Sequence, residues 1–152
     1  MAVSKLTGGH VYWVADSDPS KSLILSARFP GVPNFGDISS VDWTPLIGQV
    51  DILTAGFPCQ DISNAGKRVG IKGERSGVWK HVAEAIRTLR PRYVFLENVG
   101  AIRSRGLDVV LGDLAAGGYD AEWTSYRASS VGAPHHRDRW FCVATPADPY
   151  SR

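Results

Sequence analysis

Short apolar runs alternate along the chain with segments of helical periodicity, and this alternation limits the fold more than any other feature. The runs at 11–16, 50–57 and 92–99 are rich in β-branched and aromatic residues, as buried strands are. Helical patterns occupy 19–28 and 76–90, between these runs. Strands that alternate with helices predict an α/β domain with a mostly parallel sheet.

The rest of the chain continues the pattern. A short helix is predicted over 107–116, where a glycine pair follows, and two further strands over 119–128 and 139–145. The segment 59–76 is glycine-rich and basic, with little apolar content. It predicts a loop long enough to have a function of its own.

Size and composition favour one intracellular domain. The chain has 152 residues, 43% of them hydrophobic, which suits a single core. We expect this domain over 1–145 and a flexible tail over 146–152. No apolar run is long enough for a membrane span, and the first residues do not resemble a signal peptide. Two cysteines without metal-type spacing predict a reducing environment, no disulfide framework and no metal site.

Three chemically capable residues, Asp16, Cys59 and Glu97, end or directly follow a predicted strand. Ligands of α/β sheets bind beyond the carboxyl ends of the strands. We therefore expect the three side chains to share one rim of the sheet, which is the main indication from position that Cys59 has a function.

Two interpretations of Cys59 stay open from the residues alone. A lone cysteine suits a small buried position in the core. In GFPCQDIS, however, Pro58 stiffens the turn and a basic loop follows, and nearby cations stabilise a thiolate. Cys142, inside the apolar run WFCVA, is interpreted as a core residue.

The other polar candidates also allow two interpretations each. Glu97 either pairs with an arginine at a strand end or lies in a dry site with a raised pKa, where a protonated carboxyl donates to a ring nitrogen. Its neighbour Asn98 could hold the adjacent backbone. Asp16 either starts a helix or accepts hydrogen bonds from ribose hydroxyls. In HHRDR, Arg137 and Arg139 face one side of an extended chain and suit a phosphate and a base carbonyl, or form an exposed turn.

GFPCQDIS, FLENV and HHRDR, in this order and spacing, resemble the signature blocks of the DNA cytosine-5 methyltransferases. Weaker resemblances are VADSDP, the GDI of 36–38 and the RSGVW of 75–79. Together they cover roughly 11–145. The resemblance implies a Rossmann-like S-adenosylmethionine-dependent methyltransferase fold, a double-stranded DNA partner, a place in DNA methylation and restriction-modification, and a cytoplasmic, DNA-associated protein.

The resemblance also implies a mechanism. The target cytosine is flipped out of the duplex, and the Cys59 thiolate adds to C6 of its ring. Glu97 holds N3, Arg139 steadies the base at its carbonyl, and Arg137 contacts the site or the DNA backbone. The activated C5 takes a methyl group from S-adenosylmethionine, after which a base removes the C5 proton and Cys59 leaves.

Further residues follow from the same resemblance. Asp16 would hold the cofactor ribose, Asp37 and Ile38 would flank the adenine, and Pro58 and Val78 would line the cofactor pocket. A loop over 61–75 would close over the base. The residues implied in DNA contact are Gln60, Ser63, Lys67, Arg68 and Arg75.

The match departs from the family pattern at both ends. The glycine-rich FxGxGG turn and the target-recognition domain have no counterpart among these residues, and Ser17 stands where an aromatic residue is usual. We therefore expect an incomplete fold, weak or lost cofactor binding, and a need for missing parts or a complementing methyltransferase subunit. The alternative is a catalytically inactive truncated relative that acts as a DNA- or protein-binding module.

Overall fold

The computed structural model describes residues 2–58 and 77–148 of the chain. The chain divides into two compact units, Met1–Asp42 and Trp43–Arg152, and each is described by itself. Cys59 and the rest of the predicted loop lie outside the described residues.

The first unit consists of short helices joined by extended segments. They are α1 (Ala2–Thr7), α2 (Pro19–Arg28) and the 3-10 helix η1 (Ile38–Ser40). Helix α2 begins and ends where the sequence predicts. Its start is fixed because Asp18 accepts hydrogen bonds from the free amides of the first turn and Pro19 fits that turn. None of the side chains described in this unit is buried.

The prediction of a regular strand over 11–16 is wrong. Only Val14 pairs, in an isolated parallel bridge with Asn34. The Val14 amide donates to the Pro33 carbonyl and its own carbonyl accepts from the Phe35 amide. Two residues later the Asp16 amide bonds to the Asn34 side chain instead of a strand backbone, so the ladder does not continue.

The second unit holds the sheet. Its elements are η2 (Thr44–Leu46), β1 (Ile52–Gly56), α4 (Val78–Leu89), β2 (Tyr93–Val99), η4 (Gly100–Ser104), α5 (Leu107–Ala116), β3 (Tyr119–Arg127), η5 (Ala128–Val131) and β4 (Asp138–Pro146). Apart from the short 3-10 helices, each of these elements corresponds to a predicted one. The sequence places Pro146 and Ala147 in the tail. In the structure Pro146 ends β4, and the Ala147 amide donates to the Gly118 carbonyl.

The described strands lie in the order β1-β2-β4-β3, and the expectation of a mostly parallel sheet is wrong. Only β1 and β2 pair in parallel, whereas β4 pairs antiparallel with both β2 and β3. The connection 128–137 between β3 and β4 contains only the short η5 and no crossover helix. Antiparallel strands accept such a connection, but parallel neighbours need a crossover.

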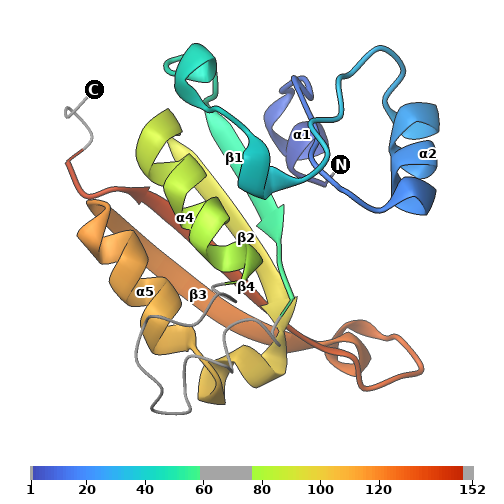
Figure 1. Cartoon of the computed structure of the whole chain (residues 1–152). Coiled ribbons are helices and arrows are strands. Elements are labelled where there is room, and N and C mark those ends of the chain that lie inside the picture. Colours follow the sequence, from blue (N-terminus) through green and yellow to red (C-terminus); the bar gives the residue numbers. More distant parts are fainter. Residues whose placement is uncertain (1, 59–76, 149–152) are drawn as a thin grey trace. The chain divides into compact units, whose positions relative to one another are not determined.

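The core lies between the sheet and the two long helices of this unit, α4 and α5, which cover one face of the sheet (Figure 1). Alternate residues of the two central strands point into it, with Leu96 of β2 and Trp140 of β4 almost fully buried. Helix α4 contributes an apolar stripe that includes Ile86 and Leu89. Among the described helices, none is long and apolar enough to cross a membrane.

Candidate functional site

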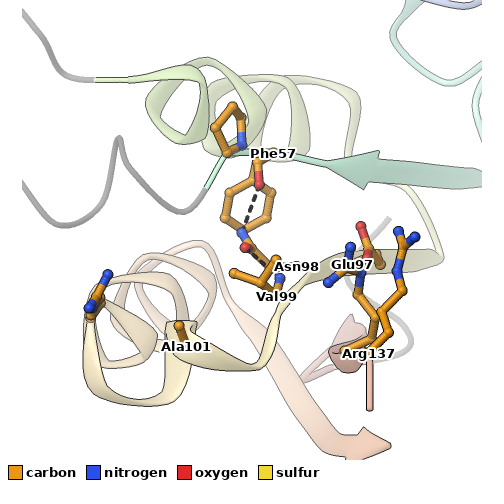
Figure 2. A pocket seen from close by; sticks show the side chains of 9 residues that line it. Phe57, Glu97, Asn98, Val99, Ala101 and Arg137 are labelled. Carbon is orange, nitrogen blue, oxygen red and sulfur yellow. Dashed lines mark hydrogen bonds and ion pairs between the residues drawn. The ribbon is translucent and has the colours of Figure 1, made fainter. Parts of the chain in front are cut away.

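A cavity of about 400 Å³ lies in the second unit where β2 ends and β4 begins. This volume falls within the usual range of small-molecule sites. Figure 2 shows the lining side chains, with those of Glu97 and Arg137 together on one side. The lining residues, here called the Glu97 cavity, are Phe57, Pro58, Glu97, Asn98, Val99, Ala101, Arg105, Arg137 and Arg139.

Glu97 and Arg139 form an ion pair in this cavity. Glu97 Oε1 lies 2.7 Å from Arg139 Nε. The Nε–H does not point along that contact and has no hydrogen-bond acceptor among the described residues, so the attraction is ionic. The Glu97 side chain is 44% exposed and that of Arg139 24%, so the described residues alone do not seal the carboxylate from water.

The buried side chain of Asn98 joins two strands beside the cavity. Its Nδ2 donates to the Phe57 carbonyl over 2.8 Å, and its Oδ1 accepts from the Val99 amide (Figure 2). The sequence predicted that Asn98 would hold neighbouring backbone, and this bond confirms it for the residue before Pro58. The geometry of the chain that leads into Pro58 therefore depends on Asn98.

Contacts of the Arg103 side chain hold the turn after β2 against the start of β4. Arg103 Nη2 lies 2.9 Å from Asp138 Oδ2, and Arg103 Nε donates to the Gly100 carbonyl. A Cβ on Gly100 would meet Asp138 Oδ2 at 2.4 Å, so only glycine allows this approach. Asp138 stands between the two cavity arginines, and its fixation limits the movement of both.

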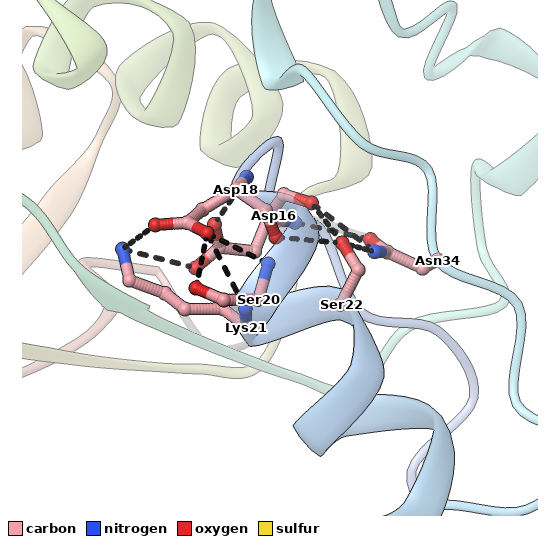
Figure 3. Close-up of polar contacts among 6 residues, drawn as sticks. All are labelled: Asp16, Asp18, Ser20, Lys21, Ser22 and Asn34. Carbon is pink, nitrogen blue, oxygen red and sulfur yellow. Dashed lines mark hydrogen bonds and ion pairs between the residues drawn. The ribbon is translucent and has the colours of Figure 1, made fainter.

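In the first unit, Asn34 organises the backbone around Asp16 (Figure 3). Its Oδ1 accepts from the amides of Asp16 and Gly36, while its Nδ2 donates to the Asp16 carbonyl and to Ser22 Oγ. Ser22 Oγ in turn donates to the Asp16 carbonyl. We call these contacts the Asp16 network, and they fix Asp16 at the start of α2.

Charge in the Asp16 network is shared between two carboxylates and one ammonium. Lys21 Nζ lies 3.7 Å from Asp16 Oδ2 and 3.9 Å from Asp18 Oδ2. Hydrogen bonds from the Ser20 hydroxyl and amide and from the Lys21 amide lower the pKa of Asp18, with the Lys21 charge as a smaller cause. Asp16 Oδ1 accepts from the Asp18 amide.

The Asp16 carboxylate could accept hydrogen bonds from the hydroxyl groups of a ribose. Its side chain is 31% exposed, and Oδ2 has only the distant Lys21 ammonium as a partner among the described residues. A carboxylate oxygen with free lone pairs can accept from hydroxyl groups. Asp37 and Ile38, at the start of η1, belong to the same unit.

The structure brings some of the predicted residues together in one cavity, while others belong to different elements or to the first unit. Glu97, Arg137, Arg139 and Pro58 line one cavity. Val78 opens α4 in the same unit, while Asp16, Asp37 and Ile38 belong to the first unit. Outside the described residues lie Cys59, Gln60, Ser63, Lys67, Arg68 and Arg75.

Sequence reasoning missed three residues that shape these sites: Asn34, Arg105 and Asp138. Asn34 makes its contacts over a long sequence separation, and no local pattern announces them. Asp138 could have been identified from the sequence, because it lies between the two arginines of HHRDR and can therefore influence the position of both. Arg105 could be suspected only from its nearness to Glu97 in the chain.

Cys142 behaves as the predicted core residue. It is 2% exposed, and burial raises the pKa of its thiol to about 11. The thiol therefore stays protonated and unreactive at neutral pH. In the described parts of the chain, no three His, Cys, Asp or Glu side chains gather closely enough to hold a metal ion.

Comparison with known proteins identifies the family of the chain. The family model for C-5 cytosine-specific DNA methylases matches residues 3–150. The type II methyltransferase M.CviJI of Paramecium bursaria Chlorella virus IL3A is 36% identical over 125 residues, covering 82% of this chain and 34% of the relative. The type II methyltransferase M.MspI of Moraxella sp is 36% identical over 145 residues, 92% of this chain and 34% of the relative. The chain thus spans about a third of the length of these relatives.

Solved structures confirm the expected α/β methyltransferase fold. The chain resembles Dnmt2 methyltransferase of S. pombe with a TM-score of 0.76 at 18% identity. The match covers 97% of this chain and 46% of the S. pombe chain. A mutant DNMT2 of Spodoptera frugiperda gives a TM-score of 0.75 at 20% identity, over 99% of this chain and 47% of the other. The chain therefore has the fold in part, as expected.

Proposed function

The chain belongs to the C-5 cytosine-specific DNA methylases, and from this membership we propose that it supplies the base-attacking part of a DNA (cytosine-5) methyltransferase. The substrate is a cytosine flipped out of double-stranded DNA. The observation that carries the proposal is the pairing of Glu97 with Arg139 in a cavity beside the Asn98–Phe57 bond. A carboxyl and a guanidinium held side by side match the adjacent N3 and O2 of a cytosine ring.

The residues have separate tasks in the reaction. The Cys59 thiolate adds to C6, which forms an S–C6 bond and shifts the C5–C6 π electrons toward C5. Glu97 holds N3 and shares a proton with it, so that negative charge on the ring is neutralised. Arg139 donates to the carbonyl O2, and Arg137 holds the base or the DNA backbone. Once C5 carries the methyl group, a base takes the C5 proton, the S–C6 bond breaks, and the thiolate is restored.

S-adenosylmethionine supplies the methyl group for C5 when it is bound. We propose that Asp16 accepts hydrogen bonds from its ribose, and that Asp37 and Ile38 flank its adenine. We propose separately, from the family resemblance, that Pro58 and Val78 contact the cofactor. The partial exposure of the Asp16 carboxylate supports its assignment, since an accessible oxygen is needed to receive a hydroxyl.

We further propose that the loop over 61–75 closes on the DNA. Gln60, Ser63, Lys67, Arg68 and Arg75 then contact the strand around the extruded nucleotide, with the cations on phosphates. Turnover requires further polypeptide, in a longer chain or in a complementing subunit. This requirement is supported by the share of the relatives, about 34%, that the chain spans.

The test is covalent trapping. Duplex DNA with 5-fluorocytosine at target positions is mixed with S-adenosylmethionine and the chain, with or without candidate complementing chains. Fluorine cannot leave as the C5 proton does, so the Cys59 adduct should persist and migrate as a protein–DNA conjugate. Cys59→Ser should abolish the conjugate, because a hydroxyl is a far weaker nucleophile at neutral pH. Glu97→Gln should slow it, because an amide cannot share a proton with N3 in the same way.

Two results would redirect the proposal. Conjugate formed by the Cys59→Ser chain would refute Cys59 as the nucleophile. DNA binding without any conjugate, in every complemented mixture, would favour the alternative of a catalytically inactive DNA-binding module. Tritiated methyl transfer to mixed-sequence duplex DNA serves as the independent assay, and robust turnover by the 152 residues alone would refute the need for further polypeptide.

A further inference from the structure

The Glu97 cavity carries more positive charge than holding one base requires. Three of its lining residues, Arg105, Arg137 and Arg139, are cations, and Glu97 is the only acid among them. Glu97 pairs with Arg139. Within the described parts of the chain, Arg105 and Arg137 have no ion-pair partner, so two unneutralised guanidiniums face one cavity.

Exposure differs among the three arginines of the cavity. The Arg139 side chain is 24% exposed and carries the ion pair, whereas Arg105 and Arg137 are exposed residues. When a base enters the cavity, the phosphates that flank it stay at the protein surface because they remain in the DNA strand. An exposed guanidinium at that position suits a phosphate.

The turn that carries Arg105 is held in place from several sides. The Arg105 amide donates to the Ile102 carbonyl over 3.0 Å, and Ile102 is fully buried. The next residue, Gly106, has a φ of 129°, a conformation that favours glycine. Arg103, in the same turn, bonds to Asp138 at the start of β4. Arg105 is thus held on the same frame as Arg139 of β4 and Arg137, which directly precedes β4.

Neighbouring arginines in this turn have different roles. Arg103 is neutralised by Asp138 and fastens the turn, so it has a structural reason to be present. Arg105 has no comparable side-chain bond to any residue that the structure describes, and it lines the cavity. We propose that Arg105 contacts the DNA phosphate next to the flipped nucleotide. This inference rests on the proposed function, because it takes the cavity to be the base site.

The experiment measures how DNA binding by the full chain depends on salt. Affinity for a fluorescent mixed-sequence duplex is determined by anisotropy between 50 and 300 mM potassium chloride. Each lost phosphate contact reduces the slope of log K against log salt by about 0.9 and weakens binding about fivefold near 0.15 M salt. Arg105→Gln should show both changes, and Arg105→Lys should retain most of the slope because the charge is kept.

Arg92→Gln is the matched control, since Arg92 is an exposed arginine that precedes β2 at the other end of the strand from the cavity. Its slope should equal that of the unchanged chain. An unchanged slope for Arg105→Gln, or an equal decrease for Arg92→Gln, would overturn the proposal. A change seen only in the binding of S-adenosylhomocysteine would assign Arg105 to a cofactor carboxylate and also overturn it.

Failure of the proposed function has a different signature. A chain that binds DNA and forms the fluorocytosine conjugate, while Arg105→Gln keeps its salt slope, removes only the role of Arg105. A chain that neither binds the duplex nor forms a conjugate in any complemented mixture removes both proposals together.

Discussion

Around the Glu97 cavity, Glu97, Asn98 and Arg139 belong to strands with a buried face. The Asp16 network, by contrast, lies at the start of α2, a helix with no buried residue. Asn98 and Trp140, neighbours across β2 and β4, are both buried. In α2, by contrast, Leu23 and Ile24 are 72% and 67% exposed. Both regions are rich in hydrogen bonds, but only the first has a core beneath it.

This difference shows what fixes a site in each region. Net hydrogen-bond energies are modest in water, so a network without burial opens locally at little cost. A polar group next to a core is held by the packing around it, because its movement would require displacing buried side chains. We therefore expect the Glu97 cavity to be rigid, and the Asp16 network to depend on its surroundings for order.

The largest expected contrast comes from removing the same side chain in the two units. Ile86 of α4 is 2% exposed and Ile24 of α2 is 67% exposed. Ile86→Ala should lower the free energy of unfolding by about 2 to 5 kcal/mol, because it loses burial and leaves a cavity. Ile24→Ala should change it by less than about 0.5 kcal/mol. Urea unfolding followed by tryptophan fluorescence measures both, and equal losses would mean that α2 has a buried face.

The second contrast uses alkaline pH. The pKa of Cys142 rises from 9.0 to about 11 on folding, so the folded state keeps the proton that the unfolded state loses. The stability from this group is complete below pH 9 and is lost as pH rises through about 11. The loss amounts to roughly 2 to 3 kcal/mol.

Measuring unfolding free energies at pH 8 and pH 11 for the chain and for Cys142→Ala isolates this contribution, because the two proteins differ only at residue 142. The decrease between the two pH values should be smaller in Cys142→Ala. Identical decreases would show that Cys142 is not desolvated in the folded state.

The third contrast pairs two asparagines. Asn98→Ala should cost about 1 to 3 kcal/mol of global stability, because it leaves the Phe57 carbonyl without its buried donor. Asn34→Ala should leave the global unfolding midpoint nearly unchanged, since its bonds are exposed. It should instead speed hydrogen exchange at the Asp16 and Gly36 amides. A global loss as large as that of Asn98→Ala would show that the first unit unfolds together with the second.

The smallest effect is expected at acid pH and only in α2. The pKa of Asp18 is below its ordinary 3.8 when folded, so its capping bonds are complete above pH 3.8. They are lost as pH falls through the lowered folded value. The amide shifts of Ser20 and Lys21 should therefore report fraying of α2 as the pH falls below 3.8, while those of β2 and β4 stay unchanged. Asp18→Ala should show the frayed shifts at every pH, and a pH-independent α2 would contradict the capping role.

Local sequence signals determined most of the elements. Asp18 with Pro19 marked the start of α2, and the apolar spacing of α4 gave its buried stripe, because capping and periodicity depend only on neighbours along the chain. The alternation within β2 placed Glu97 and Asn98 on opposite faces of the sheet. The three signature blocks identified the family, which the comparisons confirm.

Only the tertiary structure decided how these elements pair. The antiparallel place of β4 between β2 and β3 depends on long-range contacts that no local pattern encodes. The reduction of the 11–16 strand to one bridge at Val14 depends on Asn34, twenty positions along the chain by number. The approach of Gly100 to Asp138, and with it the common frame of Arg105 and Arg139, is likewise set by strand pairing. Hydrogen bonds and ion pairs between distant segments form only once the sheet has brought those segments together. The candidate residues could therefore be identified from the sequence, but their proximity depends on the tertiary structure.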